Sequence, residues 1–221
     1  MDIQIAEYVR FITLALIPFM LAITVHEYSH GLSAYMLGDD TAKRAGRLTL
    51  NPLSHIDPLG ILFLLVTRLF GWAKPVPVNF GRLEKNSKYG PAIVSFAGPF
   101  SNLLLAIISA VVLHFVSNIE VARGSVAMKI LVPVVGMLSL SVRINIALFV
   151  FNLLPIPPLD GGRIVQSLLP YNQAVAFSKI ERYGFIILIV LFLTRTIDAI
   201  IIPIIRLFLL NSTIEVITYH G

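Results

Sequence analysis

Length, composition and charge exclude several classes of protein. The chain has 221 residues, of which 57% are hydrophobic and 13% are charged, and its formal net charge is +5. Soluble domains carry roughly 25% charged residues, so this composition argues against a soluble domain and favours an integral membrane protein in the lipid bilayer. The basic residues form no Lys/Arg run, so nucleic acid is not expected as a partner. The lack of cysteine excludes disulfides, thiolate metal sites and a cysteine nucleophile.

Several apolar segments are long enough to cross a bilayer, which takes about 20 helical residues. They are expected at about Val9–Leu37, Pro91–Val116, Ile130–Leu154 and Tyr183–Leu210. Asp2 and Glu7 carry the wrong charge for a signal peptide, so the first segment is interpreted as a true span. The last segment is interrupted by Arg195, Asp198 and Pro203 and is either one helix or two. The sequence therefore predicts an all-α polytopic membrane protein with about four spanning helices, in which residues 1–221 form a single domain.

Two features are expected between the first two spans. The stretch Pro58–Phe70 is apolar but too short to cross the membrane comfortably, so it is interpreted as a re-entrant or interfacial segment. Ala45–Leu50 alternates apolar and polar residues, and Pro75–Phe80 carries prolines at a spacing that suits an edge strand. Together these two stretches predict a small β hairpin.

Most basic residues fall in connections that the four-span arrangement assigns to one side of the membrane. These are Lys43, Arg44, Arg47, Lys74, Arg82, Lys85, Lys88, Arg163, Lys179 and Arg182. Arg10, Arg123 and Lys129 fall on the opposite side. By the positive-inside rule, the regions Lys43–Tyr89 and Gly161–Arg182 are expected to face the cytoplasm, with the N terminus outside.

The clearest chemical signal is the sequence His26-Glu27-Tyr-Ser-His30 near the inner end of the first span. Residues four apart share one face of a helix, so His26 and His30 can offer imidazole nitrogens to one zinc ion. Glu27 can take a proton from a zinc-bound water and pass it to the leaving amine. Ionisable groups inside an apolar span are costly and usually mark function. The alternative is that the two histidines are neutral residues that hydrogen-bond across a helix interface.

A catalytic zinc site also needs a third protein ligand and an open position for water. Asp160 is the best candidate, because prolines end the preceding span and Gly161 and Gly162 allow close backbone approach. Such irregular backbone is tolerated within a membrane where it lines a cavity. Taken alone, the same segment could equally be an ordinary turn in which the aspartate is a cap.

With these motifs the sequence resembles the site-2 protease family of intramembrane zinc metalloproteases. The resemblance covers nearly the whole chain and also rests on the stretches Asn51–Gly60, Phe96–Asn102 and Asn152–Gly162, in the family's order. It implies one Zn²⁺ per chain with His26, His30 and Asp160 as ligands, Glu27 as the catalytic base, and Asn152 as a substrate-binding residue near the scissile carbonyl. It further implies a minimal form without PDZ or CBS domains, in which three spans surround the zinc and the hairpin lies beside the active site.

The resemblance also implies the reaction and the partners. The expected reaction is hydrolysis of peptide bonds in or near transmembrane segments, so a transmembrane protein or peptide is the expected substrate. An extended substrate would add to the edge at Pro75–Phe80. The implied location is a prokaryotic cell membrane, with the active site towards the cytoplasmic side. The sequence does not indicate the oligomeric state.

Several residues keep two interpretations. Asn152 could donate to a developing oxyanion or make a helix-packing hydrogen bond, and these carry equal weight. His55 could be a fourth ligand, but a catalytic zinc keeps a vacant position, which favours a role in loop structure or gating. Gly98, Pro99 and Asn102 are interpreted as a kink and a close helix contact in preference to a substrate contact.

Two other classes of function remain as alternatives. A transporter or channel would be supported by inverted halves, and the sequence has no internal repeat. An inactive membrane scaffold would be expected to lose its base, whereas Glu27 is present.

Overall fold

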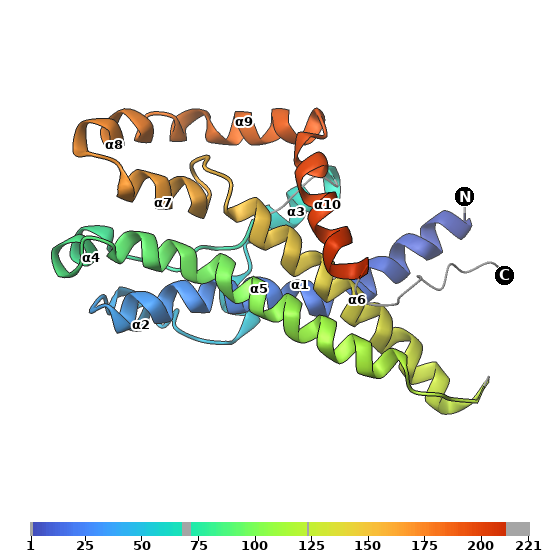
Figure 1. Cartoon of the computed structure of the whole chain (residues 1–221). Coiled ribbons are helices and arrows are strands. Elements are labelled where there is room, and N and C mark those ends of the chain that lie inside the picture. The colour runs from blue at the N-terminus through green and yellow to red at the C-terminus, as the bar shows by residue number, and fades with distance from the viewer. Residues whose placement is uncertain (1, 68–71, 123, 211–221) are drawn as a thin grey trace.

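The structure is a computed structural model that describes residues 2–67, 72–122 and 124–210, and these residues fold into helices joined by turns and extended segments (Figure 1). The helices are α1 (Asp2–Met36), α2 (Thr41–Arg44), the 3-10 helix η1 (Pro52–His55), α3 (Pro58–Thr67), α4 (Phe80–Asn86), α5 (Gly90–Ser117), α6 (Val126–Asn152), α7 (Asp160–Leu168), α8 (Tyr171–Ser178), α9 (Glu181–Leu193) and α10 (Thr196–Leu210). Three of them, α1, α5 and α6, are long and apolar enough to cross a membrane. The predicted all-α membrane architecture is therefore confirmed.

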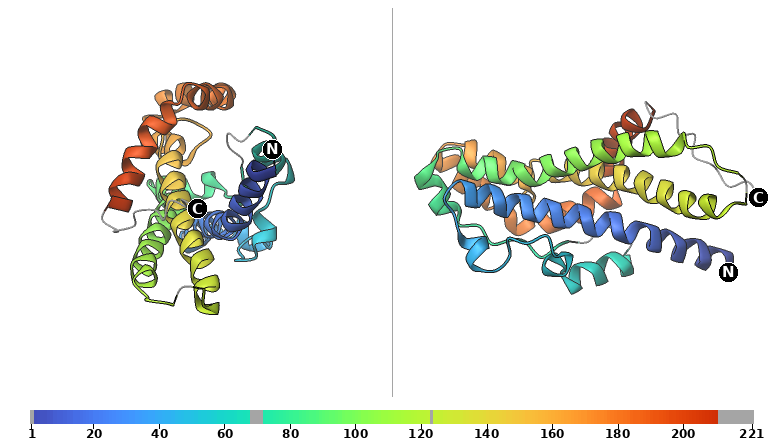
Figure 2. Two further views of the ribbon diagram at one scale, coloured as in Figure 1. Left: turned by 90° about the vertical axis from the view of Figure 1, so that its right-hand side faces the viewer. Right: turned by 90° about the horizontal axis from the view of Figure 1, so that it is seen from below.

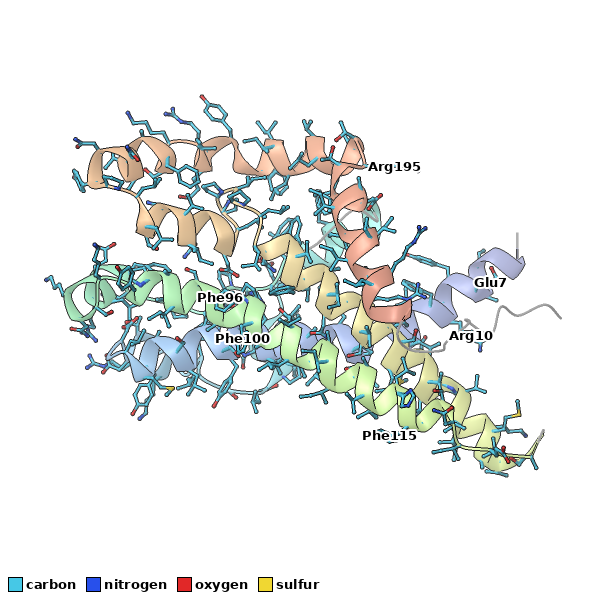
Figure 3. The ribbon with its side chains drawn as sticks, viewed as in Figure 1. Glu7, Arg10, Phe96, Phe100, Phe115 and Arg195 are labelled. Carbon is cyan, nitrogen blue, oxygen red and sulfur yellow. The ribbon has the colours of Figure 1, made fainter. Side chains whose placement is uncertain are left out.

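The last predicted span is a bent pair of helices. α9 and α10 together are apolar and long enough for a further crossing, but they are bent by 67° at their break. The break lies at Arg195, whose φ of +56° is incompatible with a continuous right-handed helix (Figure 3). Pro203, by contrast, lies inside α10 and does not end it. The described residues thus contain three candidate spans, or four if the bent pair counts as one.

The three long helices form one bundle that extends along the molecule, and α5 runs opposite to α1 and α6 (Figure 2). Four residues of α5 and α6 form a fully buried apolar cluster, namely Ala106, Leu113, Val142 and Ile146. Ile204 and Ile205 of α10 pack against this cluster. Large apolar side chains such as Ile17, Ile108 and Ile130 are exposed on the outer faces of the bundle, as expected for helices whose backbone is satisfied internally and whose side chains meet lipid.

The short helices α2, α4, α7 and α8 lie together at one end of the bundle, which we call the short-helix end (Figure 1). The N-terminal end of α1 and the connection between α5 and α6 lie at the opposite end (Figure 1). α2 carries Lys43 and Arg44, and α4 carries Arg82 and Lys85. The structure therefore gathers these basic residues at one end, as the positive-inside argument requires.

The predicted β hairpin is wrong. The described residues contain no strand, and the nearest approach to a sheet is an isolated antiparallel bridge between Ile56 and Ala73. The carbonyls of Lys74 and Pro75 accept hydrogen bonds from Nη2 of Arg47, at 2.8 and 3.3 Å, where a second strand would have supplied backbone donors. The segment 73–79 is thus an extended segment fixed by side chains.

The extended segment also has few backbone donors left for an added strand. Its prolines have no N–H group. Three of its backbone N–H groups already donate within the chain. Lys74 donates to the carbonyl of His55, Val76 to the carboxylate of Glu27 and Asn79 to the carboxylate of Asp39. The predicted substrate edge at Pro75–Phe80 is therefore not supported as a strand edge.

The short apolar stretch after the first span forms α3, which has 10 residues. At 1.5 Å per residue it is too short to cross a bilayer, in agreement with the re-entrant or interfacial interpretation. The end of the predicted stretch, residues 68–70, lies outside the described residues.

Candidate metal centre

The two histidines of the HExxH motif lie one turn apart on α1 and face the same point. Both are in the part of α1 nearer the short-helix end and are buried, with 8% of His26 and 9% of His30 exposed. Their Nε2 atoms are 3.0 Å apart, and the ring planes are inclined at 85°. The spacing of four residues therefore produces the shared face that the sequence predicted.

Asp160 reaches the same point from the other half of the chain. α6 ends at Asn152, a proline-containing loop follows, and Asp160 is the first residue of α7. Its Oδ2 atom lies 3.2 Å from Nε2 of His26 and 3.2 Å from Nε2 of His30. The ligand atoms of these three residues lie within 4.8 Å of one another, so the group could hold one metal ion.

Two glycines allow α7 to begin where it does. A Cβ atom on Gly161 would collide with the backbone carbonyls of Leu153 and Leu154, and one on Gly162 would lie 2.5 Å from the backbone nitrogen of Pro157. Both separations are below those of real Cβ contacts, so larger residues would force the loop and the helix apart. These glycines therefore permit a close backbone contact between the start of α7 and the loop that precedes it.

A third glycine, Gly98 of α5, leaves space beside the imidazoles. A Cβ atom at this position would overlap Nε2 of His30 and would lie 2.7 Å from Nε2 of His26. The predicted close helix contact at Gly98 is therefore a contact with the two candidate ligands themselves.

The remaining ring nitrogens are bound to acceptors. Nδ1 of His26 lies 2.6 Å from Oδ1 of Asn102, and Nδ1 of His30 lies 2.7 Å from the carbonyl oxygen of Val94. A neutral imidazole that donates from Nδ1 presents a lone pair at Nε2. Two such lone pairs and the carboxylate of Asp160 then converge at 3.0–3.2 Å, an arrangement that is repulsive unless a cation lies between them. Two imidazoles and a carboxylate are a usual ligand set for catalytic zinc, so the donor set fits this metal.

The charge state of Asp160 is consistent with metal binding. Burial alone would favour the protonated acid, but when the two histidines are protonated, their charges and their hydrogen bonds to the carboxylate hold the pKa of Asp160 below its usual range. A metal cation at the same point would act in the same direction. This group is therefore a carboxylate at neutral pH.

Glu27 lies next to the histidines and is also buried, with 9% of its surface exposed. Its Oε2 atom accepts a hydrogen bond of 2.7 Å from the backbone N–H of Val76. The extended segment 73–79 thus packs beside the metal centre and holds the carboxylate of Glu27 in place.

Asn152 and His55 make hydrogen bonds to backbone carbonyls outside the ligand cluster. Asn152 lies at the end of α6, and its Nδ2 atom donates to the carbonyl of Leu148 in the same helix at 3.0 Å. His55 is fully buried, and its Nε2 atom lies 2.8 Å from the carbonyl of Thr49. His55 does not belong to the cluster of candidate ligands, and its contact with Thr49 favours its interpretation as part of the loop structure.

Sequence reasoning missed the groups that orient the imidazoles. The sequence favours helix packing for Asn102, and the carbonyl of Val94 carries no signal in a sequence because every residue has one. Asn145 of α6 is the partner of Asn102. The available signal was the presence of these two amides within apolar spans, where an amide needs a hydrogen-bond partner.

Three relatives are similar to this chain over most of its length. "Putative zinc metalloprotease YwhC" of Bacillus subtilis is 42% identical over 189 residues, which are 82% of this chain and 83% of the relative. Two proteins called Rip2, with the same description, are 29% identical in Mycolicibacterium smegmatis, over 87% of this chain and 71% of the relative, and 26% identical in Mycobacterium tuberculosis, over 89% and 73%. No solved structure is significantly similar to the chain.

The family comparison agrees with the relatives. The sequence profile described as "Peptidase family M50" matches residues 117–194, a region that contains Asp160. The convergence of His26, His30 and Asp160 on one point supplies a centre at which a metal could be bound. From the identity to YwhC over most of both chains, together with the family match, we conclude that this chain belongs to peptidase family M50, the site-2 protease family of zinc metalloproteases.

Proposed function

We propose that this protein hydrolyses peptide bonds in or near the transmembrane segments of membrane proteins, with one zinc ion held by His26, His30 and Asp160. The observation that carries the proposal is the meeting of these three side chains, from α1 and from the start of α7, within 4.8 Å of one another. The buried carboxylate of Glu27 lies beside them. Hydrolysis of a transmembrane substrate is the reaction that best fits a protease centre at one end of a membrane bundle.

The chemistry divides between the metal and the chain. A bound zinc ion supplies a Lewis acid that polarises the substrate carbonyl and lowers the pKa of water. Glu27 is proposed as the general base, which accepts the proton of the attacking water and delivers it to the leaving amine. The bond from Val76 fixes one carboxylate oxygen of Glu27, so that little reorientation is required during the reaction.

Asn152 is proposed as a substrate-binding residue. It ends α6 just before the loop that leads to Asp160, which places it next in sequence to the segment that supplies the proposed third ligand. In the present geometry its side-chain amide donates to Leu148. Substrate binding would therefore exchange a helix hydrogen bond for one to the substrate carbonyl.

The proposed location is a bacterial cell membrane, with the short-helix end in the cytoplasm. The relatives named above are bacterial proteins, and the chain has several candidate spans. The placement of basic residues at the short-helix end supports this orientation. The zinc centre would then lie towards the cytoplasmic side of the bilayer.

Two measurements test this proposal. Metal analysis of the purified protein should find about one zinc per chain, and a His26→Ala, His30→Ala double variant should lose it. Comparative proteomics of membrane fragments should find cleavage products in cells with the wild-type protein that are missing with the Glu27→Gln variant. Zinc that is retained without the two histidines, or equal cleavage by Glu27→Gln, would contradict the proposal.

A further inference from the structure

A buried chain of side-chain amides leads from the candidate metal centre into the bundle. Asn102 of α5 is fully buried, and its Oδ1 atom lies 2.6 Å from Nδ1 of His26. Its Nδ2 atom donates twice, to the carbonyl of Ala22 in α1 at 3.2 Å and to Oδ1 of Asn145 in α6 at 2.8 Å. One amide therefore connects all three long helices.

The polarity of this chain is fixed at both ends by backbone carbonyls, which can only accept. The carbonyl of Ala22 requires a donor, so the amide nitrogen of Asn102 must face it. The carbonyl of Ser141 accepts from Nδ2 of Asn145 at 2.9 Å, so Oδ1 of Asn145 must face Asn102. Reversing the amide of Asn102 would place its oxygen against two acceptors. Its Oδ1 atom is therefore held towards His26.

The fixed oxygen determines where His26 carries its proton. A neutral imidazole has one N–H, and beside the acceptor Oδ1 that hydrogen belongs on Nδ1. Nε2, which lies 3.2 Å from Oδ2 of Asp160, then presents its lone pair to the metal position. The opposite tautomer would turn an N–H towards that position and would leave two acceptors facing each other at Nδ1.

We propose that Asn102 is a positioning residue that holds His26 in the Nδ1–H tautomer and thereby prepares its Nε2 atom to bind zinc. This inference rests on the proposed role of His26 as a zinc ligand. Nδ1 of His30 faces an acceptor in the same way, the carbonyl of Val94, which is a backbone group that no substitution removes. Substitution of Asn102 can therefore test whether the groups that orient the histidines affect zinc binding.

The structure also offers a bundle-packing role for Asn102, and the two roles use different atoms. Packing depends on the two bonds that Nδ2 donates to Ala22 and Asn145, whereas positioning depends on the bond that Oδ1 accepts. Asn102→Leu removes both functions. Asn102→Asp removes the donors and keeps an acceptor for His26, as in the carboxylate–histidine–zinc arrangement. Ser109→Ala is the matched control, because it removes a buried polar contact of α5, the 2.8 Å bond to the hydroxyl of Ser141, and leaves in place the carbonyl of Ser141 that orients Asn145.

The first measurement compares the histidine tautomers of the wild-type protein with those of Asn102→Leu. Long-range ¹H–¹⁵N spectra of the metal-free protein in detergent, in alkaline buffer, report the tautomer of each histidine. We expect His26 to be protonated at Nδ1 in the wild-type protein and to lose this preference in Asn102→Leu. A wild-type His26 protonated at Nε2, or an unchanged tautomer in a folded Asn102→Leu variant, would overturn the inference.

The second measurement is the zinc dissociation constant, determined by competition with a chromophoric chelator. Loss of a group that orients a ligand typically weakens metal binding by about 10–100-fold, and we expect this for Asn102→Leu but not for Ser109→Ala. Asn102→Asp should bind zinc to within a few-fold of wild type. Weak binding by a folded Asn102→Asp variant would assign Asn102 to packing alone. Failure of the wild-type protein to bind zinc would instead contradict the proposed metal centre.

Discussion

The backbone N–H of Val76 donates a hydrogen bond of 2.7 Å to the carboxylate of Glu27, across 49 residues of sequence. Its neighbours Pro75 and Pro77 have no N–H group, so Val76 supplies the donor in the middle of the Pro-Val-Pro sequence. Its side chain is buried, and a Cβ atom on Gly31 would lie 3.2 Å from it. The same residue thus packs the extended segment onto α1 and fixes one oxygen of the proposed base.

The Glu27→Gln variant is expected to separate catalysis from structure. The glutamine side-chain oxygen can still accept the hydrogen of Val76, so the fold and the zinc content should be unchanged. The amide cannot accept the proton of water, and loss of general-base catalysis typically lowers rates by about 10²–10⁴-fold. Peptide cleavage and zinc content, measured on the same preparation, test this.

A suitable control for the change of charge is Glu120→Gln, since Glu120 is exposed at the opposite end of the bundle, just after α5. It should cleave at the wild-type rate. Cleavage by Glu27→Gln at the rate of this control would show that Glu27 is not the base.

Substitution of Asp160 should distinguish the proposed third ligand from the remaining loop histidine. Asp160→Ala removes the carboxylate that lies 3.2 Å from both imidazoles. We expect the zinc dissociation constant to rise by more than about 100-fold, beyond the usual effect of a residue that only orients a ligand. His55→Ala should leave zinc binding unchanged, because Nε2 of His55 bonds the carbonyl of Thr49. If His55→Ala lost zinc and Asp160→Ala kept it, their roles would be exchanged.

Gly98 provides a test of the space beside the imidazoles. Alanine is normally preferred to glycine within a helix by about 0.5–1 kcal/mol, but here the new Cβ atom would overlap Nε2 of His30. We expect Gly98→Ala to lose zinc binding while its helix content is retained. Gly136→Ala is the matched control in α6, because the nearest atom to its Cβ would be 3.6 Å away. Equal zinc affinity in the two variants would mean that the histidines can move aside without loss of binding.

The HExxH part of the candidate site could be predicted from sequence because its geometry is local to one helix. The shared face of His26 and His30 follows from the period of one helix. The glycines after Asp160 indicate that another backbone segment packs closely there, although they do not identify that segment. Prolines end the span before this loop and an aspartate ends the loop, a combination that indicates a candidate ligand from the sequence alone. These features depend on a few neighbouring residues, so the sequence carries them directly.

The remaining parts depend on contacts between distant segments. The alternation at Ala45–Leu50 suggested a strand, but Arg47 satisfies the carbonyls of Lys74 and Pro75 with its side chain and replaces the backbone ladder. The tautomer of His26 depends on Asn102, 76 residues away. Neither partner can be identified from the periodicity of one segment, because each belongs to another element of the fold.

The neighbouring residues Asp39 and Asp40 make different kinds of contact. Asp39 is fully buried, and it accepts from the backbone N–H and the hydroxyl of Thr41 and, at 2.6 Å, from the N–H of Asn79. Asp39→Ala would remove the acceptor of these part-buried hydrogen bonds, each of which contributes about 0.5–1.5 kcal/mol net. We expect a lower melting temperature and faster proteolysis of the extended segment.

The control for this prediction is Asp40→Ala. Asp40 is about one-third exposed and forms surface ion pairs with Arg44 and Arg82, which contribute little in water. This variant should melt close to the wild-type temperature. An equal loss in both variants would show that the contact between Asp39 and Asn79 does not hold the extended segment in place.

α9 is expected to influence zinc binding although it supplies no ligand. A Cβ atom on Gly184 would overlap the carbonyl oxygen of Pro157 and would lie 2.8 Å from Cδ of Pro158. Pro157 and Pro158 belong to the loop between α6 and α7, which ends at Asp160. Gly184→Ala should therefore push this loop away from α9 and change the distance between Asp160 and the two histidines. We expect faster zinc dissociation, measured by chelator trapping, with His26 and His30 still in place. Gly81→Ala, whose Cβ atom would meet only Oδ1 of Asn79 at 3.6 Å, should release zinc at the wild-type rate. Equal release rates would show that the loop keeps its position without the close contact to α9.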